Sequence, residues 1–358
     1  MMNRDTTPEP YEWSDLDLEA FLDDTPGEVR GMVARDGRFE HLLIQREDDV
    51  AEHRLGARCV GRIVEVHPGL KGAFVDLGPI IHGFLPFRGQ DRLAVGQKVE
   101  VQVSAEPREG KGPTLRLIGA GESAPRLLAP GPTVAETLRR LAPGVEPVTG
   151  LAAIQASWDA EEEAGWPGEF FEDTGLDMMV QRTRALVAVD LDLSPAQGVS
   201  FGASARTRAN RQGVQAAARM IRLKRWGGLV AIDLIGTGQD GDVVMAAAKE
   251  AFGVDPDVVF GPVNRFGVLQ LALPWRLTPL EEVLNGHDRR RRPEQRAQDA
   301  VRSLRHSLLS DTTIPRITVR CAPDEAALAA PWVARLGPRA HLIGDPAIGP
   351  GAFIREEG

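Results

Sequence analysis

The chain is poor in cysteine, in aromatic residues and in long apolar runs. Its 358 residues include two cysteines, Cys59 and Cys321, which lie far apart and outside any Cys-x-x-Cys pair. One chain therefore cannot build a disulfide framework or a cysteine zinc site, and this pattern is typical of a reducing cytoplasm. No apolar stretch reaches the ~18–20 residues that span a bilayer, and the acidic N-terminus lacks the apolar core of a secretion signal. We therefore expect a cytoplasmic protein with no membrane partner.

A net positive charge is also missing. The formal net charge is −9, from 51 acidic and 42 basic residues. This excludes a basic field over the whole molecule, so any nucleic-acid site must be a local patch. Part of the acid lies in residues 13–24, WSDLDLEAFLDD, which contain no base. We therefore expect an acidic N-terminal tail over residues 1–24.

The composition that remains is that of a globular protein. Hydrophobic residues make up 42% of the chain and charged residues 26%, so the chain can bury a core. Its length allows two or three domains of roughly 100–200 residues each. Aromatic residues make up only 5%, so any Phe or Trp on a surface is informative.

The N-terminal third is predicted to be rich in short strands. Residues 27–46 contain two alternating apolar runs around Asp36-Gly37, which is a strong signal for a tight hairpin turn. Residues 57–118 contain five short strand-like segments divided by Gly, Pro and Asp, which favours a small barrel such as an OB-fold. Residues 119–150 are rich in Pro, Gly and Ala and mark a break in composition.

The remaining chain alternates between strand and helix. Strand-like and helical patterns alternate over residues 176–275, which predicts an α/β layer. The predicted helix at 204–226 stops at Gly227-Gly228, a usual helix exit. Residues 286–310 are predicted to form a basic helical stretch, and the C-terminal residues a small strand–helix–strand cap.

Two nearly identical runs carry the strongest chemical signal. In LVAVDLD at 186–192 and LVAIDLI at 229–235, Asp190 and Asp233 each follow four apolar residues of nearly the same sequence. If the two strands are neighbours in an α/β sheet, the two carboxylates meet near the carboxyl ends of the strands. Close carboxylates repel each other, and Mg²⁺, which prefers carboxylate and water oxygens, offsets that repulsion.

Asp192 is a candidate third residue of this site. It lies two residues beyond Asp190 and so on the same strand face, where it could bind the metal or support a ligand. The alternative is that each Asp is a turn residue or a helix cap, which is the common meaning of a single Asp at a strand end. The matched settings of Asp190 and Asp233 keep metal binding open beside this alternative.

The predicted barrel contains candidate RNA-binding residues. OB-type barrels bind single strands by stacking bases on aromatic side chains beside a positive groove. The aromatic candidates are Phe74, Phe84 and Phe87, and the basic ones are Arg62, Lys71, Arg88, Arg108 and Lys111. For any one Phe, a place in the barrel core is about as good an interpretation. As a set, we favour RNA contact.

A second basic feature follows the Asp190 strand. Four arginines recur at helical spacing and form one stripe, namely Arg208, Arg211, Arg219 and Arg222. Such a stripe could hold a phosphate backbone that lies across the two aspartates. The alternative is a solvated helix face, which is the usual meaning of a charge stripe. The run of four arginines at 289–292 has the same ambiguity, and there we favour a solvated linker helix.

Several of these segments resemble the ribonuclease E/G family of endoribonucleases. GRIVEVHPGLKGAFVDLGPIIHGFLPF is similar to that family's S1 RNA-binding domain, and RALVAVDLD to the segment with the first metal-binding Asp. RMIRLKRWGGLVAIDLI is similar to the helix and strand with the second, and NRFGVLQL to a further strand. The resemblance covers about residues 27–118 and 165–285.

The resemblance implies a multidomain α+β and α/β protein that hydrolyses single-stranded RNA with Mg²⁺. An RNase H-like piece with an inserted S1 barrel would precede a DNase I-like α/β subdomain and a small C-terminal α/β cap. The implied domains are the tail at 1–24, the RNase H-like subdomain at 25–52 plus 125–185, the S1 OB-fold at 53–119, the DNase I-like catalytic subdomain at 186–285, and the basic linker helix with its cap at 286–358.

The resemblance also implies roles for single residues. Asp190 and Asp233 would be the Mg²⁺ ligands, with Asp192 beside them in the catalytic site. Phe74, Phe84 and Lys111 match the S1 residues that hold RNA. The hairpin at 27–46 would pair with the segment around 125–185.

The chain also departs from the family pattern. Asp192 stands where the family usually has Asn, and Gly236 and Gln270 stand at positions that are often acidic. The Arg-Thr pocket that senses a 5′-monophosphate is not recognisable, and the paired-cysteine zinc link between subunits is absent. A homo-oligomer thus remains open, but not one linked by zinc.

Three functions therefore remain, in decreasing order of preference. The first is a Mg²⁺-dependent endoribonuclease in RNA processing or decay. The second is a non-catalytic RNA-binding protein of the same descent, and the third an enzyme that acts on a phosphorylated small molecule.

Overall fold

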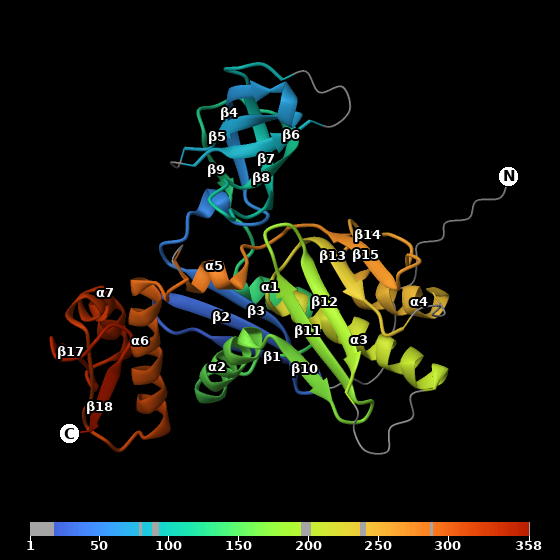
Figure 1. Ribbon diagram of the computed structural model, residues 1–358. Coiled ribbons are helices and arrows are strands. Elements are labelled where there is room, and N and C mark those ends of the chain that lie inside the picture. Colours follow the sequence, from blue (N-terminus) through green and yellow to red (C-terminus); the bar gives the residue numbers. More distant parts are fainter. Residues whose placement is uncertain are drawn as a thin grey trace.

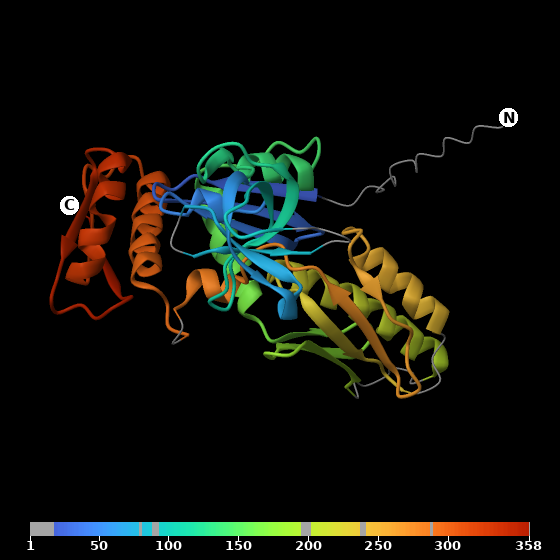
Figure 2. The same cartoon turned by 90° about the horizontal axis from the view of Figure 1, so that it is seen from above.

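Figure 1 shows the computed structural model of the chain, which describes residues 18–78, 81–87, 93–194, 202–236, 241–286 and 289–357. The strands form four sheets, of which one closes into a barrel. The barrel projects from the body of the molecule, and the C-terminal module, in red, lies at one end. Seen from above, the C-terminal module and the six-stranded sheet lie on opposite sides of the three-stranded sheet (Figure 2).

The first sheet is a three-stranded antiparallel sheet. Its strands are β1 (Leu18–Asp23), β2 (Glu28–Arg35) and β3 (Arg38–Arg46), in the order β1-β2-β3. The hairpin predicted over residues 27–46 is confirmed. Asp36 and Gly37 both have positive φ, 49° and 72°, which is what a two-residue hairpin turn of type I′ requires.

Helices cover both faces of this sheet. Met32 and Leu42 pack with α2 (Leu151–Gly165), whereas Val33 and Leu43 pack with α1 (Val134–Leu141). Because both faces are buried, the central part of the hairpin is apolar without strict alternation. Helix α1 starts with a capping box, in which the side chains of Thr133 and Glu136 each accept a backbone N–H of the other.

One prediction about this sheet needs correction. Residues 18–23, assigned to an acidic tail over 1–24, form the edge strand β1, because alternating apolar residues such as Ala20 enter the core. The hairpin pairs within the sheet with β1, and the segment around 125–185 contacts it through helices α1 and α2. Residues 1–17 lie outside the described part.

The second sheet is the barrel. Its strands are β4 (Arg58–His67), β5 (Gly72–Asp76), β6 (Gly83–Pro86), β7 (Lys98–Ala105) and β8 (Thr114–Ala120). A further short strand, β9 (Arg126–Ala129), pairs antiparallel with the start of β4. β4 pairs with both β5 and β7, and this closes the barrel in the strand order β4-β5-β6-β8-β7. A closed five-stranded barrel with this order is OB-like, as predicted.

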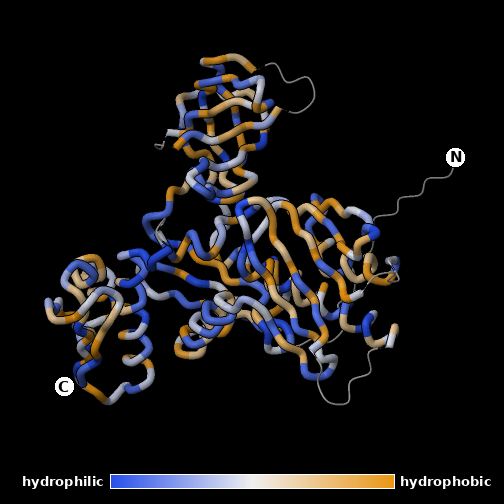
Figure 3. The backbone as a smooth tube through the Cα atoms, in the orientation of Figure 1, coloured by the Kyte–Doolittle hydropathy of each residue, from blue (hydrophilic) through white to orange (hydrophobic). Residues whose placement is uncertain are grey.

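The third sheet has six strands, and its centre carries the twin aspartate runs. The strands are β10 (Gly168–Phe171), β11 (Leu176–Arg182), β12 (Val187–Leu193), β13 (Gly228–Asp233), β14 (Val259–Phe260) and β15 (Val268–Leu273), in the order β10-β11-β12-β13-β15-β14. β12 and β13 are parallel, and every other pair is antiparallel. Apolar residues are concentrated along these strands (Figure 3).

Two helices cover one face of the six-stranded sheet. They are α3 (Ala203–Leu223) and α4 (Gly241–Phe252). Val189 and Ile232 share one core with Val214 of α3 and Val244 of α4. The predicted α/β layer is therefore confirmed. Its start needs correction, because residues 168–182 form β10 and β11 of this sheet and do not belong with the first hairpin.

The C-terminal module follows α5 (Leu280–Leu284). It contains α6 (Pro293–Ser310), β16 (Ile317–Cys321), α7 (Pro323–Val333), β17 (Ala340–Gly344) and β18 (Phe353–Glu357). The predicted strand–helix–strand cap is confirmed as β16–α7–β17, with β18 added on the free edge of β16. The arginine run 289–292 precedes α6, which begins at Pro293, so it is not part of the helix.

A buried ion network joins α6 to the three-stranded sheet. Arg302 of α6 contacts Asp23 of β1 at 2.6 Å and Glu28 of β2 at 3.2 Å, and Glu28 contacts Arg30 at 2.8 Å. All four side chains are fully buried. Burial alone would raise the pKa of Asp23 and of Glu28, but Arg302 and Arg30 hold both below their usual range.

Over the described residues, no helix is long and apolar enough to cross a membrane.

Candidate metal and RNA site

Asp190 and Asp233 lie opposite each other on adjacent parallel strands. They are register partners of β12 and β13, so their Cα atoms are separated by about one strand spacing, roughly 4.8 Å. Both side chains are exposed, and they alternate with buried residues such as Val189 and Ile232. The prediction that the two strands are neighbours is therefore confirmed. The carboxylates lie close enough in register to share one cation.

The pair lies on the open face of the sheet and not beyond its carboxyl edge. Asp233 ends β13, but Asp190 lies within β12, because β12 continues to pair with β11 as far as Leu193. Within the described part of the chain, neither carboxylate has a hydrogen bond or ion pair. The two acids thus face solvent with their oxygens free for a ligand.

Asp192 shares this face, but its neighbour is a different acid. It is the register partner of Asp177 on β11 and accepts the N–H of Leu193 at 2.8 Å. Asp177 was not singled out from the sequence, although its alternation with Met179 and Gln181 could have placed it on this face. Among the described residues, no group of three or more Asp, Glu, His or Cys side chains is placed to hold a metal. A metal would therefore rest on the Asp190–Asp233 pair and water, which suits Mg²⁺.

Apolar side chains surround the acids on the open face. Met179 lies opposite Asp190 on β11, and Phe170 lies opposite Asp177 on β10. Phe170 is 48% exposed and Leu229, on β13, is 46% exposed. The carboxylate pair is therefore bordered by exposed apolar surface that could contact nucleobases.

The arginine stripe of α3 does not lie over the carboxylate pair. α3 packs on the opposite face of the sheet, against Val189 and Ile232. Arg219 is bound inside the protein by Glu163 and Glu169, and Arg222 donates to the Ala251 carbonyl at 2.7 Å. The prediction that this stripe holds a phosphate backbone across the two aspartates is therefore wrong.

The first half of the stripe remains exposed. Arg208 contacts Asp173, in the β10–β11 turn, at 2.9 Å, and Arg211 faces solvent. Both lie toward the N-terminal end of α3. RNA contact by Arg208 and Arg211 stays a prediction. It would require an RNA strand that passes around the end of the six-stranded sheet.

On the barrel, Phe74 and Phe84 form an aromatic pair. They are register partners of β5 and β6, with ring centroids 5.5 Å apart and planes at 61°. Both are half-buried, whereas their neighbours Ala73 and Leu85 point into the barrel core. The pair therefore lies on the outside of the second and third barrel strands, which are the strands that bind ligands in OB-folds.

Glycine at position 72 is required beside this pair. A Cβ atom on Gly72 would lie 2.2 Å from Cζ of the Phe84 ring, so the ring lies directly against the backbone there. Phe87, in contrast, packs against the barrel core. Of the three Phe residues, Phe87 thus follows the core interpretation.

Lys111 lies near Phe84. The Phe84 N–H donates to the carbonyl of Pro113, two residues after Lys111, at 2.8 Å. The Lys111 side chain is 70% exposed and contacts Glu109 at 3.5 Å. Lys71 is also exposed, Arg62 contacts Asp76 at 3.4 Å, and Arg88 lies outside the described residues.

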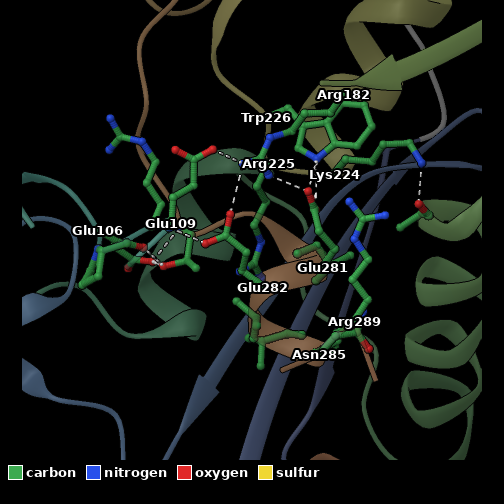
Figure 4. Close-up of a pocket in the computed structure, with 18 of the residues that line it drawn as sticks. Glu106, Glu109, Arg182, Lys224, Arg225, Trp226, Glu281, Glu282, Asn285 and Arg289 are labelled. Atoms are coloured by element: carbon green, nitrogen blue, oxygen red, sulfur yellow. Dashed lines mark hydrogen bonds and ion pairs between the residues drawn. The ribbon is translucent and has the colours of Figure 1, made fainter. Parts of the chain in front are cut away.

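A chamber of about 1230 Å³ lies between the barrel, β11, α2 and α5. Figure 4 shows some of the side chains that line it. Among all its lining residues, basic ones outnumber acidic ones. Arg182 contacts Glu109 at 2.8 Å and Glu282 at 3.1 Å, which ties the barrel turn to α5. Trp226 Nε1 donates to Glu281 at 3.0 Å. These residues were not predicted from the sequence, because they come from four distant segments.

Lys224 is an unusual cation of this chamber. Its Nζ donates to the carbonyls of Ala164 and Trp166 at the end of α2, at 2.5 and 2.7 Å. Burial lowers the pKa of Lys224 to about 8. The chamber thus contains a cation that lacks a carboxylate partner among the described residues.

Comparison with known proteins finds a family match for the segment that carries the acidic pair. Residues 172–273 match the sequence model of the ribonuclease E/G family. This segment contains Asp190, Asp192 and Asp233, the strands β12, β13 and β15, and helices α3 and α4. No curated protein sequence matches the chain. Residues 172–273, which carry the paired aspartates, are thus similar to the ribonuclease E/G family.

Proposed function

We propose that the protein is a Mg²⁺-dependent endoribonuclease of the ribonuclease E/G type, which hydrolyses single-stranded RNA in RNA processing or decay. The observation that supports this best is the register pairing of Asp190 with Asp233 on an open sheet face, within the segment that matches the family. Two free carboxylates on adjacent strands are otherwise unfavourable, because like charges repel at this distance.

Asp190 and Asp233 would hold the ion, and Asp192 would act beside them. Bound Mg²⁺ supplies an activated water and stabilises the charge on a phosphodiester under attack. Asp192 points from the same face about 7 Å farther along β12. From there its carboxylate can accept a hydrogen bond from water or from a ribose hydroxyl, but it cannot donate one as the amide of Asn does.

The barrel and the chamber suggest a path for the RNA. Phe74 and Phe84 would stack bases, and Lys111 would bind a phosphate. Lys111 also lines the chamber, and so does Gln181, which lies one exposed position along β11 from Met179, the partner of Asp190. On this proposal, the RNA would run through the chamber from the aromatic pair of the barrel toward the open face that carries the acids.

The chain order supports the domain assignments that the resemblance implies. The chain leaves the three-stranded sheet after β3, forms the barrel, and returns as α1, which packs on β2. We propose that this is an RNase H-like piece with an inserted S1 barrel. The six-stranded sheet with α3 and α4 would be the DNase I-like catalytic subdomain, beginning with β10.

The decisive experiment uses three Asp→Asn variants on one sheet face. Cleavage of an unstructured 5′-labelled RNA is followed with Mg²⁺ and with EDTA. Asp190→Asn and Asp233→Asn should each reduce cleavage by at least about 100-fold, more than the ~10–100-fold typical of groups that only support metal ligands. The matched control, Asp177→Asn, should keep most of the activity. Cleavage that persists in both metal-site variants would exclude the mechanism.

A second candidate is a non-catalytic RNA-binding protein. It is favoured by the two-carboxylate site, which lacks a third ligand among the described residues, and by Asp192 in place of the family's Asn. Purified protein that binds RNA through Phe74 and Phe84 but never cuts it, in Mg²⁺ or Mn²⁺, would establish this function. An enzyme for a phosphorylated small molecule would instead keep its activity in Phe84→Ala.

A further inference from the structure

A second cavity, of about 540 Å³, lies between β3, α1, α3, α4 and residues 273–277. Its volume is within the range of about 300–1,000 Å³ that is usual for pockets that bind small organic molecules. Most of its wall is apolar and includes Leu43, Val134, Ile221, Phe252, Leu273 and Leu277. Arg225 and Trp226 line both this cavity and the chamber, so they form the partition between the two.

Basic groups gather at one end of this apolar cavity. Arg222, Arg225 and His41 all line it. Arg222 contacts Glu40 at 3.4 Å, but Glu40 is shared with Arg35, also at 3.4 Å. Arg225 donates to the Leu42 carbonyl at 2.9 Å and has no ion pair among the described residues. Arg222 thus has a carboxylate partner in Glu40, whereas Arg225 has none among the described residues.

Burial disfavours the charged forms of all three groups. It lowers the pKa of Arg225 to about 10 and also lowers that of Arg222. Burial, with Arg222 beside it, lowers the pKa of His41 to about 4. An anion placed here would offset charges that the protein itself leaves uncompensated.

The acidic residues of the cavity wall are already bound elsewhere. Asp255 contacts Arg276 at 2.9 Å, and Glu106 accepts the N–H groups of Leu55 and Thr278 at 3.2 and 3.1 Å. These two acids therefore do not neutralise Arg222 or Arg225. The rest of the cavity offers apolar surface.

We propose that this cavity binds a small amphipathic organic anion. Its acidic group would lie beside Arg222 and Arg225, where charge-assisted hydrogen bonds are strong. Its apolar body would lie against Phe252, Leu273 and Leu277, where removal of apolar surface from water favours binding. This inference does not depend on RNA cleavage. Because the wall comes from the three-stranded sheet and from the helices of the six-stranded sheet, the ligand would also stabilise the junction between them by mass action.

The test is a calorimetric titration of the full-length protein with decanoate. Decanol, which has the same chain length without charge, and decyltrimethylammonium, which has the opposite charge, are the ligand controls. Decanoate should bind saturably with one site per chain, and both controls should bind at least about tenfold more weakly, as expected when a charge-assisted hydrogen bond is missing.

Three variants locate the site. Arg222→Gln should weaken decanoate binding about tenfold or more, and Leu277→Trp, which fills the cavity, should abolish it. The matched control is Arg139→Gln, a change on an exposed arginine of α1 outside the cavity wall, and it should bind as the wild type does. Circular dichroism verifies the fold of each variant.

Three outcomes would overturn the proposal: no saturable binding of decanoate, equal binding of decanol, or full affinity in a folded Leu277→Trp variant. If Arg222→Gln does not fold, the comparison of Leu277→Trp with the wild type decides alone. Loss of RNA cleavage in the Asp190→Asn variant would leave decanoate binding unchanged, so the two proposals fail separately.

Discussion

Phe74 and Phe84 lie side by side on the outside of the barrel, paired in register across β5 and β6 with their rings edge to face at 5.5 Å. Such a pair is a rigid platform, because each ring is half-buried and the Phe84 ring rests against Gly72. Bases of any kind can stack on it, since every base has a π-face. This geometry favours a single strand without strong base preference.

The first prediction is that the aromatic pair carries much of the RNA affinity. Phe84→Ala should weaken binding of an oligouridine by roughly 10–100-fold, because stacking is worth about 1–3 kcal/mol per base. Fluorescence anisotropy measures this. The control is Phe266→Ala, which removes a 65% exposed Phe from outside the barrel and should not change the affinity. Equal affinity of Phe84→Ala and wild type would show that RNA binds elsewhere.

The second prediction concerns the charge of Lys111. If Lys111 neutralises one phosphate, Lys111→Gln should reduce the slope of log affinity against log salt by about 0.7, the value for one contact to a single strand. Lys98 is an exposed lysine of β7, a strand that does not pair with β5 or β6, and Lys98→Gln should leave the slope unchanged. Identical slopes for wild type and Lys111→Gln would place Lys111 outside the RNA site.

The third prediction concerns the ion network between α6 and the three-stranded sheet. Arg302→Met removes one guanidinium partner from each of the buried acids Asp23 and Glu28, so the free energy of unfolding should fall by roughly 3–5 kcal/mol. Arg335→Met is the control, because Arg335 and its partner Glu47 are both about half exposed and such pairs contribute at most ~1 kcal/mol. Urea unfolding measures both. Similar losses in the two variants would show that the network is not a special source of stability.

The fourth prediction concerns pH. Burial lowers the pKa of His41 to about 4, below the ~6.5 of an unfolded chain, so the unfolded state binds the proton more tightly between these values. Stability should therefore rise as pH increases from about 4 to about 6.5. His41→Gln should flatten this part of the profile. Thermal unfolding at several pH values measures the slope, and an unchanged slope in His41→Gln would contradict the assignment.

Much of the architecture could be predicted from the sequence, because it depends on local patterns. The hairpin at Asp36-Gly37, the closed barrel, the α/β layer and the C-terminal strand–helix–strand all follow from turn residues and hydrophobic periodicity. The neighbouring positions of Asp190 and Asp233 followed from two matched apolar runs. The predicted end of the acidic tail at residue 24 was wrong, because β1 is a short edge strand. Its acidic residues obscure its alternation of apolar and polar residues. Its Asp23 is paired inside the protein by a residue 279 positions away.

The sequence could not predict which arginines of α3 are exposed and which are ion-paired. A stripe of arginines has the same sequence pattern whether it faces solvent or carboxylates. Arg208 is exposed, while Arg219, on the same helix face, is bound between Glu163 and Glu169 from other segments. Likewise, Arg182, Lys224 and Trp226 became chamber residues only when β11, α2 and α5 met around them.

The candidate chemical groups, two aspartates in matched apolar runs and two phenylalanines in short barrel strands, could be identified from residue type and alternation alone. These are local properties of the chain and do not depend on the fold. The face that each group occupies became known only from the packing of the folded chain. That packing set the carboxylates on the open side of the sheet and the arginine helix on the other, because it buries whichever face matches its partner. It also decided which charges are neutralised within the protein, since ion pairs form between segments that sequence order keeps apart.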